Sequence, residues 1–171
     1  MYVRATRSKI IYSAFPYSVG PNAASRKLFV PRQSITSLIY VSTARPGLDQ
    51  DEFLSILGVA ERNNQRVGIT GLILYNGFNF IQCLEGDRAS VNDRLYHIGL
   101  DDRHNGLTIL SHDDMPSRQF AQWSMAGQYL PIQQGLLQAD VAKILSDDAV
   151  IEATRRLFES FLSLGAKQSI P

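Results

Sequence analysis

Two polar side chains stand inside strongly apolar segments, and together they could carry chemistry. Tyr40 lies within residues 38–42, and Gln82 lies within residues 79–86. A buried phenol or amide that lacks a hydrogen-bond partner costs about 1–3 kcal/mol. The two side chains therefore bond either to each other and the nearby backbone or to a bound polar molecule. We favour a bound molecule, because Asn64 lies on a third element that converges on the pair in the expected fold. A planar heterocycle with ring carbonyls and an N–H would suit these groups.

Other kinds of site have weaker support in the sequence. The motifs of serine hydrolases, zinc proteases and phosphate-binding loops are absent. The one cysteine, Cys83, excludes an intramolecular disulfide, and no Cys/His spacing indicates a metal site. RNA binding is set aside because residues 34–171 are acidic overall. An acylphosphatase-like enzyme stays open as an alternative, although Arg45 comes without a glycine cradle.

Hydrophobic spacing and turn signals predict the elements that must position these residues. Alternating β-branched segments predict strands, and apolar residues at i, i+3, i+4 and i+7 predict helices. We expect five strands, at 35–42, 68–75, 78–84, 107–110 and 123–129. We also expect four helices: one that follows residues 46–47, one that begins near Asp87, one at 136–145, and one that follows a cap at 147–148. The first helix should stop near residues 63–64. Asn76 and Gly77 should form a type I′ turn, whose two central residues need φ > 0.

The order of these elements predicts the fold class. It is typical of an α+β fold with a ferredoxin-like βαββαββ sheet and two helices on one face. Both alternating sets of side chains in the middle strands are apolar, so the other face also needs a cover. An apolar stripe within residues 150–164 predicts that a C-terminal helical tail, 131–171, packs there. Binding of a partner to the tail is the alternative.

The charge of the chain is unevenly distributed. Although the 171 residues carry a net charge of +1, residues 1–33 hold 6 basic side chains and no acidic one. Such a segment can bind nucleic acid or membranes, or serve as a transit peptide. Because no amphipathic or aromatic–basic pattern is sustained, we expect a disordered leader of unknown role. Residues 34–130 would then form the binding domain, in a reducing cytoplasm.

Several short segments together resemble the BLUF family, the blue-light sensors that use FAD. The matching stretches are 38–42, 62–64, 68–72, 79–86, 101–104 and 120–125. Their order, spacing and combination agree, and the resemblance covers over half of the chain. The helical tail resembles that of the short, single-domain members, whereas the leader does not match.

The resemblance implies a photochemical role for Tyr40 and Gln82. They would form a hydrogen-bonded chain to the flavin N5 and C4 carbonyl, with Tyr40 as the electron and proton donor to the excited flavin. Gln82 would end rotated or tautomerised, and its stronger bond to the C4 carbonyl would shift the absorption to the red. Asn64 would bind the C4 carbonyl and N3–H, Asn63 would lie near the C2 carbonyl, and Ser42 would lie beside the tyrosine. A helix C-cap explains the asparagines equally well, and an ordinary strand hydroxyl explains Ser42.

The resemblance also implies roles for positions farther along the chain. His97, Asp101 and Arg103 match cofactor-binding positions near the ribityl-phosphate end, although surface charge is an alternative interpretation. Trp123 and Met125 match the switch pair of the last strand. Strand alternation puts both on one face, where either can pack beside the glutamine and pass a change to the tail. Core packing would explain both residues as well.

We therefore expect a photoreceptor that binds FAD noncovalently and signals through a protein partner. It would assemble as a homo-oligomer, bind neither nucleic acid nor a membrane, and catalyse no reaction. A light-independent regulator that binds flavin or another small molecule is the alternative. The purified protein would be yellow if it is either of these two and colourless if it is an acylphosphatase-like enzyme. Only the photoreceptor would show a reversible shift of the flavin band in blue light.

Overall fold

The structure, a computed structural model, describes residues 34–129 and 135–167. Its elements are β1 (Ile35–Ala44), α1 (Gln50–Arg66), β2 (Thr70–Tyr75), β3 (Asn79–Gly86), α2 (Arg88–Gly99), β4 (His104–Met115), β5 (Ala126–Tyr129), α3 (Gly135–Leu145) and α4 (Glu152–Lys167). The expected leader lies outside the described residues. No helix within the described ranges is long and apolar enough to cross a bilayer.

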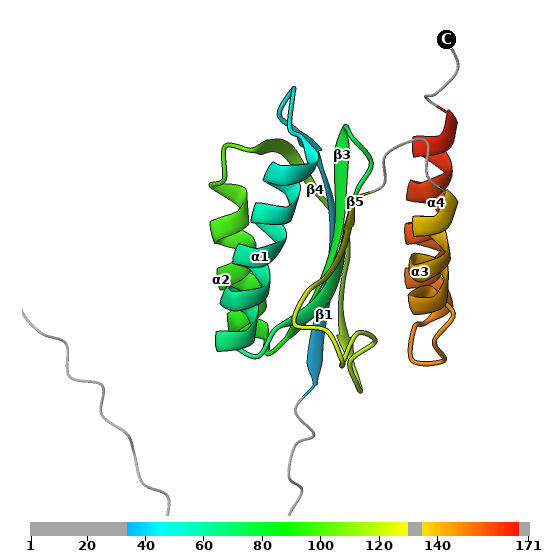
Figure 1. Ribbon diagram of the computed structural model, residues 1–171. Coiled ribbons are helices and arrows are strands. Elements are labelled where there is room, and N and C mark those ends of the chain that lie inside the picture. Colours follow the sequence, from blue (N-terminus) through cyan, green and yellow to red (C-terminus); the bar gives the residue numbers. More distant parts are fainter. Residues whose placement is uncertain (1–33, 130–134, 168–171) are drawn as a thin grey trace, which may run out of the picture. The chain divides into compact units, whose positions relative to one another are not determined.

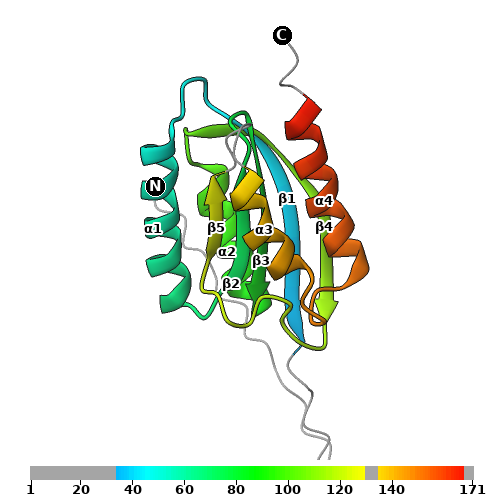
Figure 2. The ribbon, with the colours of Figure 1, turned by 45° about the vertical axis from the view of Figure 1, so that its right-hand side comes forward.

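The strands form a five-stranded sheet in the order β4-β1-β3-β2-β5. β5 runs parallel to β2, and the other neighbouring strands are antiparallel. Helices α1 and α2 lie on one face of the sheet, while α3 and α4 lie on the other (Figures 1 and 2). This arrangement confirms the ferredoxin-like α+β fold and the expected cover of the second face.

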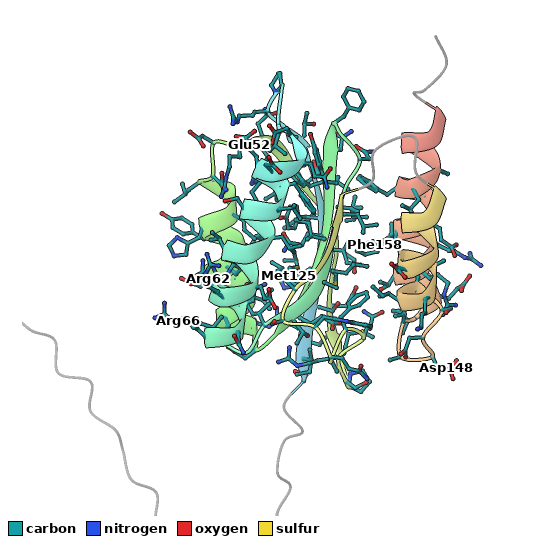
Figure 3. The ribbon with its side chains drawn as sticks, viewed as in Figure 1. Glu52, Arg62, Arg66, Met125, Asp148 and Phe158 are labelled. Carbon is teal, nitrogen blue, oxygen red and sulfur yellow. The ribbon has the colours of Figure 1, made fainter. Side chains whose placement is uncertain are left out.

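Two hydrophobic cores lie on opposite sides of the sheet, because neighbouring strand residues point to opposite faces. Leu38 and Tyr40 belong to the core under α1 and α2, which also holds Phe53 and Met125. Ile39 belongs to the core under the tail, which also holds Phe120, Val141 and Phe158. Figure 3 shows Met125 on the α1 side of the sheet and Phe158 on the α4 side. The apolar stripe of the tail therefore stabilises the sheet itself.

Aspartates set the first residues of α1 and α2, as the sequence predicts. The Asp49 side chain accepts a hydrogen bond from the Glu52 backbone N–H at 2.9 Å, and the Glu52 side chain reaches back to complete a capping box. The Asp87 side chain accepts from the Ser90 backbone N–H at 3.0 Å. Each cap satisfies a backbone donor that has no partner within its helix.

The hairpin between β2 and β3 differs by one position from the expected turn. The Asn76 N–H donates to the Asn79 carbonyl at 3.2 Å, so Gly77 and Phe78 are the central residues. Gly77 has φ 93°, which suits glycine. The Asn76 side chain instead accepts from the backbone N–H groups of Phe78 and Asn79, at 3.1 and 2.8 Å. The expected position of the turn was wrong, because Asn76 is the first residue of the turn and its side chain accepts from the backbone N–H groups that follow.

Other boundaries also differ from expectation. Helix α1 continues to Arg66, beyond the asparagines at which it was expected to stop. β4 is longer than expected because its exposed residues pair with β1, and antiparallel pairing needs no apolar pattern. Asp147 does not cap α4 directly: its side chain accepts from the Ala149 N–H at 2.9 Å, in a turn that precedes the helix.

Candidate functional site

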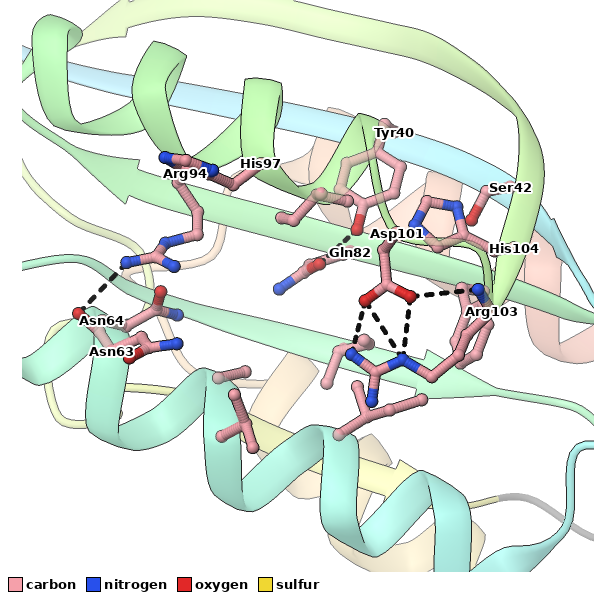
Figure 4. Close-up of a pocket in the computed structure, with 16 residues that line it drawn as sticks. Tyr40, Ser42, Asn63, Asn64, Gln82, Arg94, His97, Asp101, Arg103 and His104 are labelled. Carbon is pink, nitrogen blue, oxygen red and sulfur yellow. Dashed lines mark hydrogen bonds and ion pairs between the residues drawn. The ribbon is translucent and has the colours of Figure 1, made fainter.

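Tyr40 and Gln82 lie directly opposite each other on the central strands β1 and β3. The Tyr40 hydroxyl donates a hydrogen bond to Gln82 Oε1 (Figure 4). Each residue is only 3% exposed. Burial raises the pKa of the Tyr40 phenol well above its ordinary value, and the nearby Asp101 carboxylate raises it further. The phenol is therefore held protonated, as a hydrogen-bond donor.

A cavity of about 260 Å³ lies between this part of the sheet and the helices α1 and α2. Its apolar wall is formed by Ile56, Val59, Ala60, Ile73, Phe80 and Ile98. Polar groups line the rest: Tyr40, Ser42, Asn63, Asn64, Gln82, Arg94, His97, Asp101, Arg103 and His104. The combination of an apolar wall and convergent polar groups is typical of small-molecule sites, which usually measure about 300–1,000 Å³.

Four buried polar atoms on the cavity wall have no hydrogen-bond partner among the described residues. They are Ser42 Oγ, Asn64 Oδ1, Arg94 Nε and His104 Nδ1. Buried polar groups are nearly always paired, so a cluster of unpaired ones indicates a missing partner. Asn64 Oδ1 can only accept a hydrogen bond, and Arg94 Nε can only donate one. A ring that offers both N–H and carbonyl groups would satisfy both atoms. The cavity therefore fits the polar edge of a flavin ring.

Asn63 and Asn64 hold one end of the cavity. The Asn64 carbonyl accepts from Val67 and Ile69 at 3.1 and 2.9 Å, so its backbone helps to end α1. Its side-chain Nδ2 donates to the Ser124 carbonyl at 3.2 Å, which leaves Oδ1 facing the cavity. The C-cap interpretation of the asparagines was wrong, because both lie inside α1 and its C-cap is Val67, whereas the binding role of Asn64 stays a prediction.

An ion pair lies at the other end of the cavity, beside His104 (Figure 4). Arg103 and Asp101 are bonded through more than one atom pair. The hydrogen bond from Arg103 holds the pKa of Asp101 below its usual value and outweighs the opposing effect of partial burial. His97 lines the same cavity, but its side chain is 60% exposed and lies 3.7 Å from Asp93. Asp101 and Arg103 therefore form a charged rim that solvent reaches, whereas His97 lies beside Arg94 (Figure 4).

All eight expected cofactor-binding residues line one cavity, and two polar residues that the sequence reasoning missed join them. Arg94 comes from α2, and its NH2 donates to the Asn63 carbonyl at 3.2 Å. His104 begins β4 and follows directly after Arg103. Arg94 could have been found from its spacing, because it is three residues after the buried Val91 on the inward face of α2.

Met125, rather than Trp123, lies beside Gln82. The distance from Gln82 Nε2 to Met125 Sδ is 3.4 Å, and Met125 is only 5% exposed. Trp123 packs in the other core, with its ring 6.4 Å from that of Phe120. The expectation that both side chains share one face was wrong. They precede β5 in a turn, where the Trp123 N–H donates to the Phe120 carbonyl at 3.2 Å, so strand alternation does not apply.

Solved structures and curated proteins include several that are similar to this chain. The solved structure titled "BlrP1 BLUF" shares 26% sequence identity with this chain, with a TM-score of 0.65, over 81% of this chain and 96% of that one. The blue light- and temperature-regulated antirepressor BluF of Escherichia coli (strain K12) is 33% identical over 91 residues, which are 53% of this chain and 23% of the relative.

A photoactivated adenylate cyclase subunit beta of Euglena longa is 27% identical over 113 residues, which are 61% of this chain and 13% of that protein. The chain thus matches less than a quarter of the length of these curated relatives. The family model described as "Sensors of blue-light using FAD" matches residues 35–126, which include β1 to β4 and every residue assigned to the cavity. The chain belongs to this family, BLUF, whose members bind a flavin.

Proposed function

We propose that this chain is a blue-light sensor that binds FAD noncovalently in the cavity between the sheet and α1 and α2. The observation that carries the proposal is the buried hydrogen bond between Tyr40 and Gln82 in the cavity wall. A phenol beside an amide supplies an electron and proton donor next to a group that can exchange donor for acceptor. A bound flavin would absorb blue light and, once excited, accept an electron.

The dark orientation of Gln82 follows from its neighbours. The Tyr40 hydroxyl donates to Oε1, so Nε2 points away from Tyr40 and lies 3.4 Å from Met125 Sδ. A thioether is a weak acceptor, so this N–H bond is the weaker of the two. The Gln82 amide is thus fixed mainly by the Tyr40 proton.

Removing that proton reverses the preference of the amide. A Tyr40 oxygen without its hydrogen can only accept, and it would repel Gln82 Oε1. Rotation of the Gln82 side chain would turn an N–H group toward Tyr40, whereas the imidic tautomer would turn an O–H group toward it. Either change alters what the amide offers to the cavity. This exchange between two hydrogen-bonding arrangements is the proposed switch.

The remaining polar residues of the cavity would hold the cofactor. Asn63, Asn64 and Arg94 lie together at one end, where Asn64 Oδ1 can accept and Arg94 Nε can donate (Figure 4). These groups would bind the polar ring edge. A second set would bind the ribityl-phosphate part: Ser42, Asp101, Arg103 and His104 at the charged rim, and His97, which lies beside Arg94 (Figure 4).

An absorption experiment tests the proposal. The protein should be purified in darkness, and its cofactor should be released and identified as FAD, FMN or riboflavin by chromatography. Blue light should shift the flavin band reversibly to the red. Tyr40→Phe and Gln82→Leu should keep the flavin and lose the shift. Tyr96→Phe, at a tyrosine that is 65% exposed, is the matched control and should respond like the original protein. Bound flavin without a light response would favour a light-independent regulator, and protein without any flavin would refute the proposal.

The output of the sensor is proposed to pass through a protein partner. Among the relatives, one is named an antirepressor and another an adenylate cyclase subunit. We propose that this chain performs no catalysis and that 34–130 senses light while the tail, 131–171, transmits the signal. We also propose that it forms a homo-oligomer in the cytoplasm. Light scattering in darkness and under illumination measures the oligomeric state directly.

A further inference from the structure

On the side of the sheet away from the cavity, buried hydrogen bonds connect β3 to the start of α4. Ser37 Oγ lies 3.6 Å from Cys83 Sγ, and Gln119 Nε2 donates to Ser37 Oγ at 3.3 Å. The backbone N–H of Ile151 donates to Gln119 Oε1 at 3.0 Å. Cys83 is fully buried, and Ser37 and Gln119 are 4% and 3% exposed. Cys83 follows Gln82 directly on β3, so the connection begins one residue from the proposed switch.

The chemistry of the groups sets the direction of these bonds. A backbone N–H can only donate, so the Gln119 amide must turn its oxygen toward Ile151 and its NH2 toward Ser37. The Ser37 oxygen then accepts, and its own hydrogen is free to point at the Cys83 sulfur. Rotating the Gln119 amide by half a turn would place its NH2 against the Ile151 N–H. The arrangement therefore has one satisfied orientation, held at the helix end by Ile151.

The backbone of Gln119 is fastened to β3 by a second set of bonds. The N–H groups of Gln119 and Phe120 donate to the Glu85 carboxylate at 3.0 and 2.9 Å. Glu85 belongs to β3 and is fully buried. Charge-assisted bonds of this kind are stronger than neutral ones. The backbone of Gln119 is thus attached to β3, while its side chain bonds to β1 through Ser37 and to the first residue before α4.

Ile151 marks the place where α4 begins. The Arg155 N–H donates to the Ile151 carbonyl at 3.0 Å, whereas the N–H of Ile151 itself lies before the first residue of α4 and has no acceptor within that helix. Such end groups need a partner outside the helix. Gln119 supplies that partner, so any movement of Gln119 changes how the first turn of α4 is held.

We propose that Gln119 is a positioning residue that couples the Gln82 strand to α4 and transmits the light signal to the tail. The inference rests on the proposed function. A change at Gln82 shifts β3 against β1, and Gln119 is bonded to both strands. The contact between Ser37 and Cys83 is the longest of the connection and involves a weak acceptor, so it responds first. The Gln119 side chain then loosens its hold on the Ile151 N–H.

The test is amide hydrogen exchange of Ile151, measured by NMR on the full chain with bound flavin, in darkness and under continuous blue light. One net hydrogen bond corresponds to about two- to tenfold in exchange. In the original protein, light should speed exchange at Ile151 by about this factor. The red shift of the flavin band is recorded in the same sample, so a failure of the photochemistry is distinguished from a failure of the coupling.

Two variants separate coupling from simple support of the helix. Ser37→Ala leaves the Gln119–Ile151 bond in place, so exchange in darkness should stay slow and light should no longer change it. Gln119→Leu should give fast exchange in both conditions. Both should keep the flavin red shift and the helix content in circular dichroism. Ser37→Thr, which keeps the hydroxyl, should restore the light effect, and Gln122→Leu, at an exposed glutamine in the same segment, should leave it intact.

Two results would overturn the proposal. One is a normal red shift in the original protein without any light effect at Ile151. The other is a light effect that survives in either Ser37→Ala or Gln119→Leu. If the original protein shows no red shift at all, the proposed function itself fails, and the coupling fails with it.

Discussion

The bond between Tyr40 and Gln82 makes a quantitative prediction for a double-mutant cycle. Tyr40→Phe leaves Gln82 Oε1 without its partner, and Gln82→Leu leaves the Tyr40 hydroxyl without its partner. Each single change costs about 1–3 kcal/mol where water cannot replace the lost partner. Replacing both groups by apolar ones removes the unpaired atoms together. The double variant should therefore lose less free energy of unfolding than the sum of the single variants.

The cavity determines where in this range the coupling energy falls. Both residues line a space of about 260 Å³, which water can enter when the flavin is removed. Water satisfies part of each unpaired group, so we expect a coupling energy of about 1 kcal/mol, at the lower end of the range. The assay is urea denaturation of the flavin-free full chain, because bound flavin would add its own stabilisation.

Thr43 and Asn79 provide a matched control on the same two strands. They also lie directly opposite each other, and their side chains are bonded at 3.2 Å in an exposed position. The cycle of Thr43→Val and Asn79→Ala should give a coupling below about 0.5 kcal/mol, because solvent competes for the bond. A coupling between Tyr40 and Gln82 below about 0.3 kcal/mol, within the usual error of additivity, would refute the buried bond.

Three further predictions follow from other features of the structure. Because the pKa of Tyr40 is raised in the folded protein, its phenol stays neutral there at a pH at which the unfolded chain ionises, near pH 10. The free energy of unfolding should therefore fall as pH rises above 10, by about 1.4 kcal/mol per pH unit more than in Tyr40→Phe, and equal slopes in urea titrations would contradict this. Arg94→Leu should weaken flavin binding in darkness by about tenfold, since a charge-assisted bond is lost; unchanged affinity in a fluorescence titration would remove Arg94 from the site. Gly71→Ala should destabilise the fold by more than about 3 kcal/mol, because its Cβ would lie 2.0 Å from the Cys83 carbonyl oxygen; Gly99→Ala, with nothing within 4 Å, should be tolerated, and equal urea midpoints for the two would contradict the packing.

The order of the elements was predictable because each strand and helix carries its own local signal. The Asp49 and Asp87 caps and the alternation through Tyr40 follow from near neighbours in the sequence. The register that places Tyr40 opposite Gln82 does not, because it depends on pairing between strands 42 residues apart. Sequence reasoning therefore identified the pair from its apolar surroundings but could not show that the two side chains bond.

The missed and misplaced residues share a physical cause. Arg94 reads as a solvated charge because a long aliphatic stem with a polar end fits a helix surface and a cavity wall equally well. Trp123 and Met125 were assigned to one face by the rule for strands, but the backbone turns there. In both cases tertiary contacts decide where the polar or apolar group lies. The spacing from Val91 places Arg94 on the inward face of α2 but does not show what its side chain contacts.

The separation of the two cores by one sheet has a consequence for how such proteins diversify. The cavity lies under α1 and α2, whereas α3 and α4 cover the opposite surface. Substitutions in the core under the tail therefore leave the cavity wall intact, and substitutions in the cavity wall leave the packing of the tail on the sheet intact. The flavin-binding side can thus be combined with new tails, in evolution or by engineering, as long as the register of the central strands is kept.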